Sequence, residues 1–141
     1  MAAPRHLARR LALQALYEMD VGGHDPTATL ERSLKEMRIG EDLGEFARTL
    51  LQGVLNAKAE IDGIIERTAP AWPTEQLAPI DRNILRIAIR ECIVDNLTPV
   101  GAAINEAVEL AKDFGSESSS RFINGVLGSL SAAKTAPQEG Q

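Results

Sequence analysis

Apolar residues recur every three or four positions along nearly the whole chain, as on one face of an α-helix. No stretch alternates apolar and polar residues in the way a half-buried strand does. Glycine, proline and serine stand at most of the breaks between the periodic stretches, where they favour helix ends and starts. The pattern predicts an all-α fold, a compact bundle of about seven helices.

The breaks also predict where the helices lie. Gly22–Gly23 closes the first helix, Gly115 is expected to be a left-handed cap, and Ser116 is expected to cap the last helix. The stretch 80–96 is apolar around most of its circumference and should be the central helix. The predicted helices cover 5–21, a stretch from 26, a stretch from 41, 60–69, 80–96, 102–114 and 116–130.

The chain length and composition fit a single domain. With 141 residues, 44% of them hydrophobic, the chain can bury one core. We expect a single helical domain over residues 1–131 and a disordered tail over 132–141. No apolar run approaches the roughly 20 residues of a membrane span. The single cysteine, Cys92, excludes a disulfide framework within the chain, so we expect a cytoplasmic protein without metal or cofactor.

Two predicted helices carry stripes of opposite charge. Arg82, Arg86 and Arg90 are four residues apart, and Glu106, Glu109 and Asp113 share one face of the next helix. We expect these stripes to pair with each other or with water. A catalytic carboxylate pair drawn from Glu106 and Asp113 is the alternative, but nothing else in the sequence supplies a site around it.

The positive charge of this acidic chain is concentrated at its start. Residues 1–17 hold three arginines and no acid, although the whole chain has a formal net charge of −5. A helical wheel separates an apolar face from a polar one. The apolar face holds Ala8, Leu11, Ala12, Ala15, Leu16 and Met19, and the opposite face holds His6, Arg9, Arg10, Leu13, Gln14 and Tyr17.

The polar face of this helix predicts a site for RNA or another anionic partner. Positive charge at a helix N-terminus opposes the helix dipole, so the arrangement is locally unfavourable and is expected where function requires it. Guanidinium groups bind phosphate in bidentate geometry and stack on bases. The alternative is that these arginines pair with acids elsewhere in the fold.

A second candidate site lies at the start of the last helix. Phe122 is set among small residues beside Arg121, and the serines of 116–120 offer backbone N–H groups to a phosphate. Phe122 is either a platform on which RNA bases stack or a core residue packed against a helix that approaches closely over Gly125.

Three segments together resemble the NusB family of bacterial transcription antitermination factors, from about Arg5 to Leu130. They read ARRLALQALYEMD, ILRIAIREC and TPVGAAINEAVELAKDFGSESSSRFINGVL. The resemblance implies an all-helical fold of two small subdomains and no enzymatic activity. It also implies binding of single-stranded boxA RNA together with NusE, a small-subunit ribosomal protein. Through that complex it implies an indirect association with other Nus factors and RNA polymerase during ribosomal RNA synthesis.

The resemblance also implies functional residues. Tyr17 and Asp81 match positions on the side that faces NusE. The sequence departs from the family at His6 and Leu7, which interrupt the arginine run, and at Arg10, where many relatives carry an acid. Ser118 stands where some relatives carry Asp. The residues implied to bind RNA are Arg5, His6, Arg9, Gln14, Ser118, Arg121 and Phe122.

Two other hypotheses stay open. NusB-like domains also occur at the N-terminus of RNA cytosine methyltransferases, but this chain has no Gly-rich cofactor loop and no catalytic cysteine pair. The chain could instead form a homodimer whose RNA-binding face is masked, with Leu13 in the interface.

Overall fold

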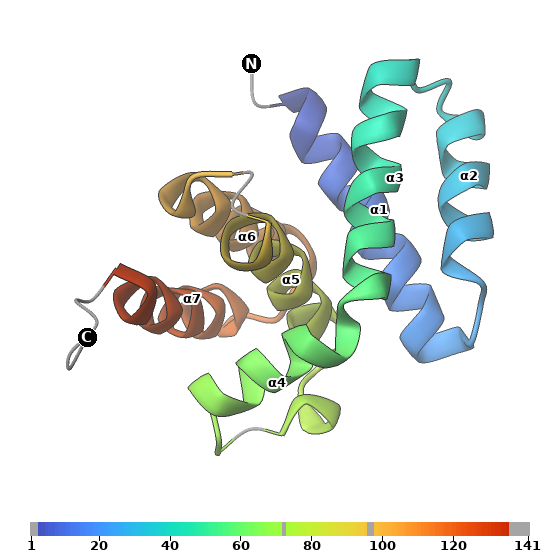
Figure 1. Cartoon of the computed structure of the whole chain (residues 1–141). Helices are drawn as coiled ribbons and strands as arrows, with labels where there is room; N and C mark the ends of the chain where they lie inside the picture. Colours follow the sequence, from blue (N-terminus) through green and yellow to red (C-terminus); the bar gives the residue numbers. More distant parts are fainter. Residues whose placement is uncertain (1–2, 72, 96–97, 136–141) are drawn as a thin grey trace.

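The structure is a computed structural model that describes residues 3–71, 73–95 and 98–135. These residues form seven α-helices and no strand, so the all-α prediction is confirmed (Figure 1). A short 3-10 helix, Thr74–Gln76, precedes the fifth α-helix, and a π-helical turn, Arg90–Val94, continues it. The α-helices are α1 (Ala3–Gly22), α2 (Pro26–Glu36), α3 (Glu41–Asn56), α4 (Lys58–Thr68), α5 (Pro79–Ile89), α6 (Val100–Phe114) and α7 (Ser119–Thr135).

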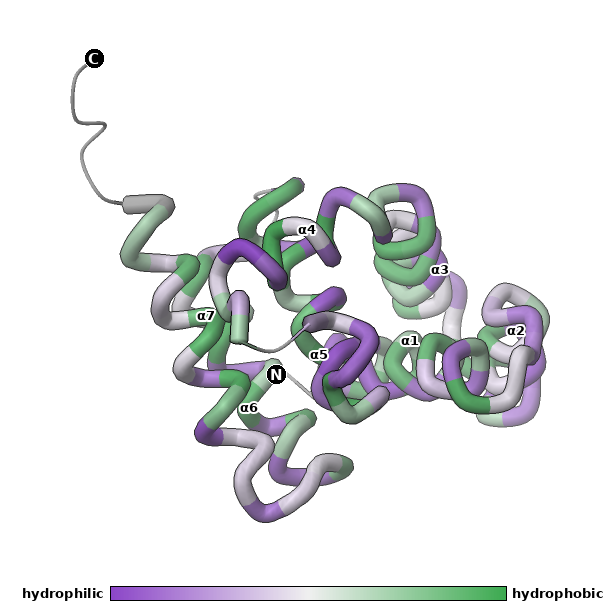
Figure 2. The backbone as a smooth tube through the Cα atoms, turned by 90° about the horizontal axis from the view of Figure 1, so that it is seen from below, coloured by the Kyte–Doolittle hydropathy of each residue, from purple (hydrophilic) through white to green (hydrophobic). Residues whose placement is uncertain are grey.

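The helices form two groups that meet along α1 and α5. α1, α2 and α3 pack together on one side, and α4, α6 and α7 surround α5 on the other (Figures 1 and 2). Asn83–Ile89 of α5 are all buried, which confirms that this helix is the central one. α1 runs along α5 with Ala8, Ala12 and Ala15 fully buried, because these small side chains allow a close approach.

Glycine and proline set several helix ends as predicted. Pro26 and Pro79 each stand in the first turn of a helix, where the missing N–H has no intrahelical partner to lose. Gly23 follows α1 with φ of 70°, and its N–H donates to the Met19 carbonyl at 3.1 Å. Glycine adopts this left-handed conformation without the steric cost that a side chain adds.

The predicted connection between α6 and α7 is wrong in two details. Gly115 is extended, with φ −90° and ψ −175°, and is not a left-handed cap. α7 begins at Ser119 instead of Ser116, because the Ser119 hydroxyl accepts the Ser116 N–H at 2.9 Å and closes a separate turn. A Cβ on Gly115 would lie 2.5 Å from the Ser119 Cβ, so this position requires glycine for lack of space.

The ends of two other helices also differ from the prediction. The regular part of the predicted helix 80–96 ends at Ile89, and the Asp95 N–H then donates to the Arg90 carbonyl at 3.0 Å, the spacing of a π-turn. α7 extends to Thr135, so its last turn includes residues assigned to the predicted tail. The rest of that tail, 136–141, and residues 96–97 lie outside the described residues. No helix in the described part of the chain is long and apolar enough to cross a membrane.

Candidate nucleic-acid and protein interface

Arg9 is buried in an ion pair with Glu91. The arginine is 5% exposed, and its Nε and Nη2 donate to the two Glu91 carboxylate oxygens at 2.9 and 2.7 Å. Thr98 donates its hydroxyl to Glu91 at 2.8 Å, and Glu106 lies 3.4 Å from Arg9 Nη1. Burial lowers the pKa of Arg9, but the hydrogen bond and charge of Glu91 and the charge of Glu106 outweigh it and raise the pKa.

The predicted polar face of α1 is therefore only partly exposed. For Arg9 the alternative holds, because its charge is paired with an acid elsewhere in the fold. Leu13 is 2% exposed and belongs to the core, so the prediction that it lies on an open face is wrong. The helical wheel places both residues opposite the apolar face of α1, but this face is also covered by neighbouring elements. The burial of Leu13 removes the observation on which the homodimer hypothesis rested.

His6 joins α1 to the middle and the C-terminal end of α6. Its Nδ1 lies 2.9 Å from Glu106 Oε1 and its Nε2 lies 3.4 Å from Asp113 Oδ2. The imidazole is partly buried, so it holds the first turn of α1 against α6 instead of projecting into solvent.

The two charged stripes do not pair with each other. Asp20 Oδ2 accepts hydrogen bonds from Arg82 Nε at 3.0 Å, Asn83 Nδ2 at 2.9 Å and Arg86 Nη1 at 3.0 Å. Asp62 binds the Arg86 guanidinium through both carboxylate oxygens, each at 2.9 Å. Arg82 and Arg86 therefore point to α1 and α4, and Arg90 pairs with Asp95 at 2.9 Å. The acidic stripe of α6 instead supplies Glu106 and Asp113 to the start of α1.

The other two arginines of α1 are exposed and lie on aromatic rings. The Arg5 guanidinium carbon is 4.6 Å from the centre of the Phe46 ring, and that of Arg10 is 5.2 Å from the centre of the Phe114 ring. Neither arginine has a carboxylate partner within the part of the chain that the structure describes. Their charge is therefore available to an anionic ligand.

The second predicted segment, at the start of α7, lies beside the first. The contact of His6 with Asp113 brings the end of α6 to α1, and the loop with Ser118 follows directly. Ser118 and Arg121 are exposed. The predicted phosphate cradle is reduced, because the Ser116 N–H is bound by Ser119.

Phe122 is half-buried and packs against the core. Its predicted neighbour Gly125 is exposed, and a Cβ there would meet no atom within 4 Å. No helix therefore approaches closely over Gly125, and that part of the core alternative for Phe122 is wrong.

An apolar groove of about 460 Å³ runs along α1. It is bounded by Met37 after α2, Ile80 at the start of α5 and Phe114 at the end of α6. Tyr17, Met37 and Phe114 are 36%, 50% and 41% exposed, which makes them three of the four exposed large hydrophobic residues described. Gln14 stands in the wall of the groove and donates to Glu18 at 3.1 Å. Such a concentration of exposed apolar side chains indicates a binding surface.

Asp81 lies next to Ile80 in the first turn of α5. Its Oδ1 is buried, with no hydrogen-bond partner among the described residues. A carboxylate is favoured at a helix N-terminus by the helix dipole, but an unsatisfied buried oxygen is unusual in a native fold. The first turn of α5 thus holds a buried carboxylate oxygen that the described part of the fold leaves without a donor.

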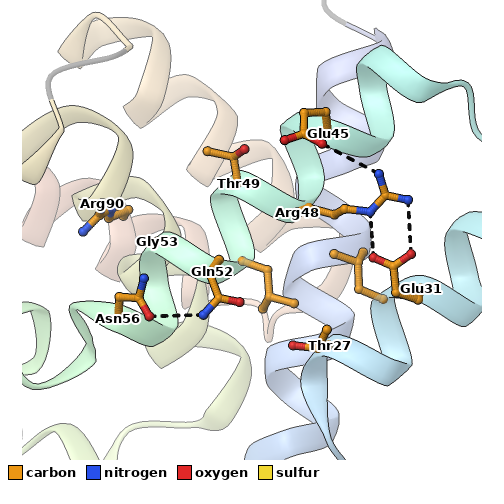
Figure 3. A pocket seen from close by; sticks show the side chains of 11 residues that line it. Thr27, Glu31, Glu45, Arg48, Thr49, Gln52, Gly53, Asn56 and Arg90 are labelled. Carbon is orange, nitrogen blue, oxygen red and sulfur yellow. Dashed lines mark hydrogen bonds and ion pairs between the residues drawn. The ribbon is translucent and has the colours of Figure 1, made fainter.

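A second hollow, of about 500 Å³, lies between α2 and α3 and includes none of the predicted site residues (Figure 3). Its polar side chains bind one another: Arg48 donates to Glu31 at 2.7 Å, and Gln52 donates to Asn56 at 3.1 Å. This hollow is separate from the candidate interface.

Sequence reasoning did not single out Phe114, Met37 or Glu91. Phe114 and Met37 each stand at or just past the end of a helix, where an apolar residue before a helix stop is a weak signal. Glu91 carried no local signal, because its partner Arg9 is distant in sequence.

Comparison with known proteins places these features in a family. The NusB family model matches residues 6–132. A transcription antitermination protein NusB from Dehalococcoides mccartyi is 50% identical over 94% of this chain and 93% of its own length. One from Roseiflexus castenholzii is 46% identical over 92% of this chain and 93% of its own.

Solved structures agree with this assignment. T. maritima NusB superposes with a TM-score of 0.85 at 33% identity, covering 99% of this chain and 97% of that one. The NusB chain solved with NusE and double-stranded RNA gives 0.84 at 30% identity, covering 94% and 99%. The fold, the helix order and nearly the whole length are shared, and the chain belongs to the NusB family of transcription antitermination proteins.

Proposed function

We propose that this chain binds boxA-type single-stranded RNA together with the ribosomal protein NusE, and thereby supports transcription of ribosomal RNA in the cytoplasm. Other Nus factors and RNA polymerase would be reached through this complex. The chain itself would carry out no catalysis.

The observation that carries this proposal is the meeting of two distant segments. His6 contacts Asp113, and Arg10 lies on Phe114, so the start of α1 adjoins the loop that leads into α7. The start of α1 and the start of α7, which the sequence suggested as two separate RNA sites, would thus form one edge of the molecule. Residues 18–141 hold 12 basic and 20 acidic residues, so most of the surface outside this edge would repel RNA.

The residues of this edge would have different roles. The exposed side chains of Arg5, Gln14, Ser118 and Arg121 would contact RNA directly. Arg9 and His6 would act indirectly, because both are engaged with carboxylates that hold the start of α1 in place. Phe122 would contribute from a half-buried position.

NusE would occupy the groove along α1, with Tyr17 in its wall, and would reach Asp81 in the first turn of α5. Tyrosine is favoured in protein interfaces because its ring buries a large area and its hydroxyl still finds a partner. The similar NusB structure is described as a complex with NusE and double-stranded RNA, which supports a joint site for protein and RNA.

The test is equilibrium binding of a labelled boxA-type single strand, with a shuffled strand and a duplex of the same sequence as matched controls. We expect the boxA strand to bind most tightly, and to bind more tightly still when NusE is present. Equal affinity for the boxA and shuffled strands, or no effect of NusE, would contradict the proposal.

The methyltransferase hypothesis has its own test. We expect no methyl transfer from S-adenosylmethionine to RNA by this chain under conditions in which boxA RNA is bound. Measurable transfer would show that the chain is catalytic.

A further inference from the structure

The groove along α1 is mainly apolar, but one end carries a charged side chain beside an aromatic ring. Arg10 and Phe114 stand there, both exposed, with the guanidinium carbon 5.2 Å from the ring centre. The bordering residues elsewhere in the groove, such as Met37 and Ile80, are uncharged. One end of the groove therefore presents a cation on an aromatic ring, and the remainder is mainly apolar.

This pair is suited to a nucleobase. Splayed bases of single-stranded RNA stack on aromatic rings and on guanidinium planes, and both surfaces are present here. The positive charge of Arg10 has no carboxylate partner in the described part of the chain and complements the phosphates on either side of a stacked base. The adjacent acid, Asp113, is in contact with His6.

The position of the pair favours RNA over the protein partner. Phe114 is the last residue of α6, and the loop with Ser118 begins one residue later. A strand bound by Ser118 and Arg121 therefore passes close to Phe114, whereas Tyr17 and Met37 lie in the remainder of the groove.

We propose that Arg10 and Phe114 form a stacking site for one nucleobase of the bound RNA. This inference rests on the proposed function and extends it, because Phe114 was not among the residues expected to bind RNA and Arg10 was expected only as part of the basic face of the first helix. It divides the groove into an RNA end at Phe114 and a protein end at Tyr17.

The experiment places the fluorescent base 2-aminopurine at successive positions of the boxA-type strand and measures quenching in the complex with the chain and NusE. We expect strong quenching at one position. Phe114→Leu should abolish it and lower RNA affinity about 5- to 150-fold, the effect of losing one stacked base. Phe114→Tyr keeps the ring and should retain both.

Arg10 is tested by variants that separate its charge from its planarity. Arg10→Lys keeps the charge and should retain the salt dependence of binding while reducing the quenching. Arg10→Gln should also reduce the salt dependence. Val21→Ala changes an exposed apolar residue outside the groove and serves as the control, with unchanged RNA affinity.

Three results would overturn the inference. Unchanged affinity and quenching in Phe114→Leu would exclude stacking on this ring. Weaker NusE binding without any change in RNA binding would assign this end to the protein partner. An equal loss in Phe114→Leu and Phe114→Tyr, accompanied by lower thermal stability in both, would make the residue structural. If the unaltered chain binds no boxA RNA even with NusE, the proposed function fails as well.

Discussion

At the residue scale, the buried ion pair of Arg9 and Glu91 fixes α1 against the segment that follows α5. Both groups are almost fully removed from water, which costs free energy that their mutual hydrogen bonds and charge offset, together with Thr98 and Glu106. The pair links α1 to the π-helical turn that follows α5, and Thr98 donates a hydrogen bond to Glu91 from the following segment. Arg9 therefore stabilises the start of α1, where RNA is proposed to bind, but its guanidinium is not free to contact RNA.

Removing one member of this pair should destabilise the chain strongly. We expect Arg9→Met to lower the free energy of unfolding by about 3–5 kcal/mol, because it leaves Glu91 buried without its partner. Urea denaturation at neutral pH measures this. Arg5→Met removes an exposed arginine of the same helix and should change the free energy by less than about 1 kcal/mol.

The double variant Arg9→Met with Glu91→Leu should recover much of the loss, since no buried charge remains unpaired. A cost for Arg9→Met as small as that for Arg5→Met would show that the pair is not buried in solution.

Asp20 gives a prediction about pH. Burial raises its pKa, but the hydrogen bond from Asn83 and the charges of Arg86 and Arg82 outweigh it and lower the pKa. A group whose pKa is lower in the folded state stabilises the fold above its unfolded pKa of about 3.9, and this stabilisation is lost as the pH falls through the folded value. We expect the free energy of unfolding to decline below about pH 4.

Asp20→Asn should be less stable at neutral pH and should lose less of its stability on acidification than the unaltered chain. Urea denaturation at several pH values between 7 and 2 measures both slopes. Parallel slopes in the two proteins would contradict the assignment to Asp20.

The residues of α1 differ in how far the local sequence predicts their environment. The periodic alanines and leucines of α1 are buried as predicted, because helical spacing is a local property. The fate of Arg9 depends on Glu91, which is 82 residues away, and nothing in the local pattern indicates that an acid will cover it.

At the scale of elements, the α6–α7 connection is the most constrained part of the site. A Cβ on Gly115 would lie 2.5 Å from the Ser119 side chain and 2.8 Å from the Ala111 carbonyl oxygen. We expect Gly115→Ala to destabilise the chain by about 1–3 kcal/mol, as overpacking does, and to weaken RNA binding by displacing Ser118.

Gly125→Ala in α7 is the matched control. A Cβ there meets no atom within 4 Å, and replacing a glycine inside a helix should stabilise the chain by about 0.5–1 kcal/mol. Thermal unfolding and RNA binding of both variants measure the difference. A Gly115→Ala protein as stable as Gly125→Ala would contradict the crowding seen at this connection.

The helices themselves were predictable, and their ends were less so. Proline at the starts of α2 and α5 marks a boundary in any context, because its ring fixes the backbone and removes a donor. The start of α7 was placed three residues too early, since the serines of 116–120 can support either a helix or a turn. The Ser119 hydroxyl accepts the Ser116 N–H and stabilises the turn, and a run of similar serines does not indicate which hydroxyl will do so.

At the scale of the whole molecule, the distribution of charge would confine the proposed RNA binding to one edge. The chain carries a net charge of −5, and several of its arginines in α1 and α5 are already paired with carboxylates. The groove adjoins the RNA edge, so one face can hold RNA and a protein partner side by side. This layout supports the proposed joint binding of RNA and NusE.

A substitution at the Tyr17 end of the groove should change NusE binding without changing RNA binding. Tyr17→Ala should weaken NusE binding about tenfold or more, since tyrosine at an interface centre commonly contributes over 1 kcal/mol. The same variant should leave RNA binding without NusE unchanged. Calorimetric titration with NusE checks the first expectation, and a variant that loses RNA but retains NusE would contradict the placement of the protein end.

The most direct test of the account is a salt series of boxA RNA binding, with and without NusE, for the unaltered chain and for Arg5→Gln with Arg10→Gln. We expect NusE to increase the affinity for RNA. We also expect the double variant to lower the slope of log affinity against log salt by up to about 0.7 for each lost phosphate contact. An unchanged slope and affinity in the double variant would contradict the claim that the exposed arginines of α1 bind the RNA.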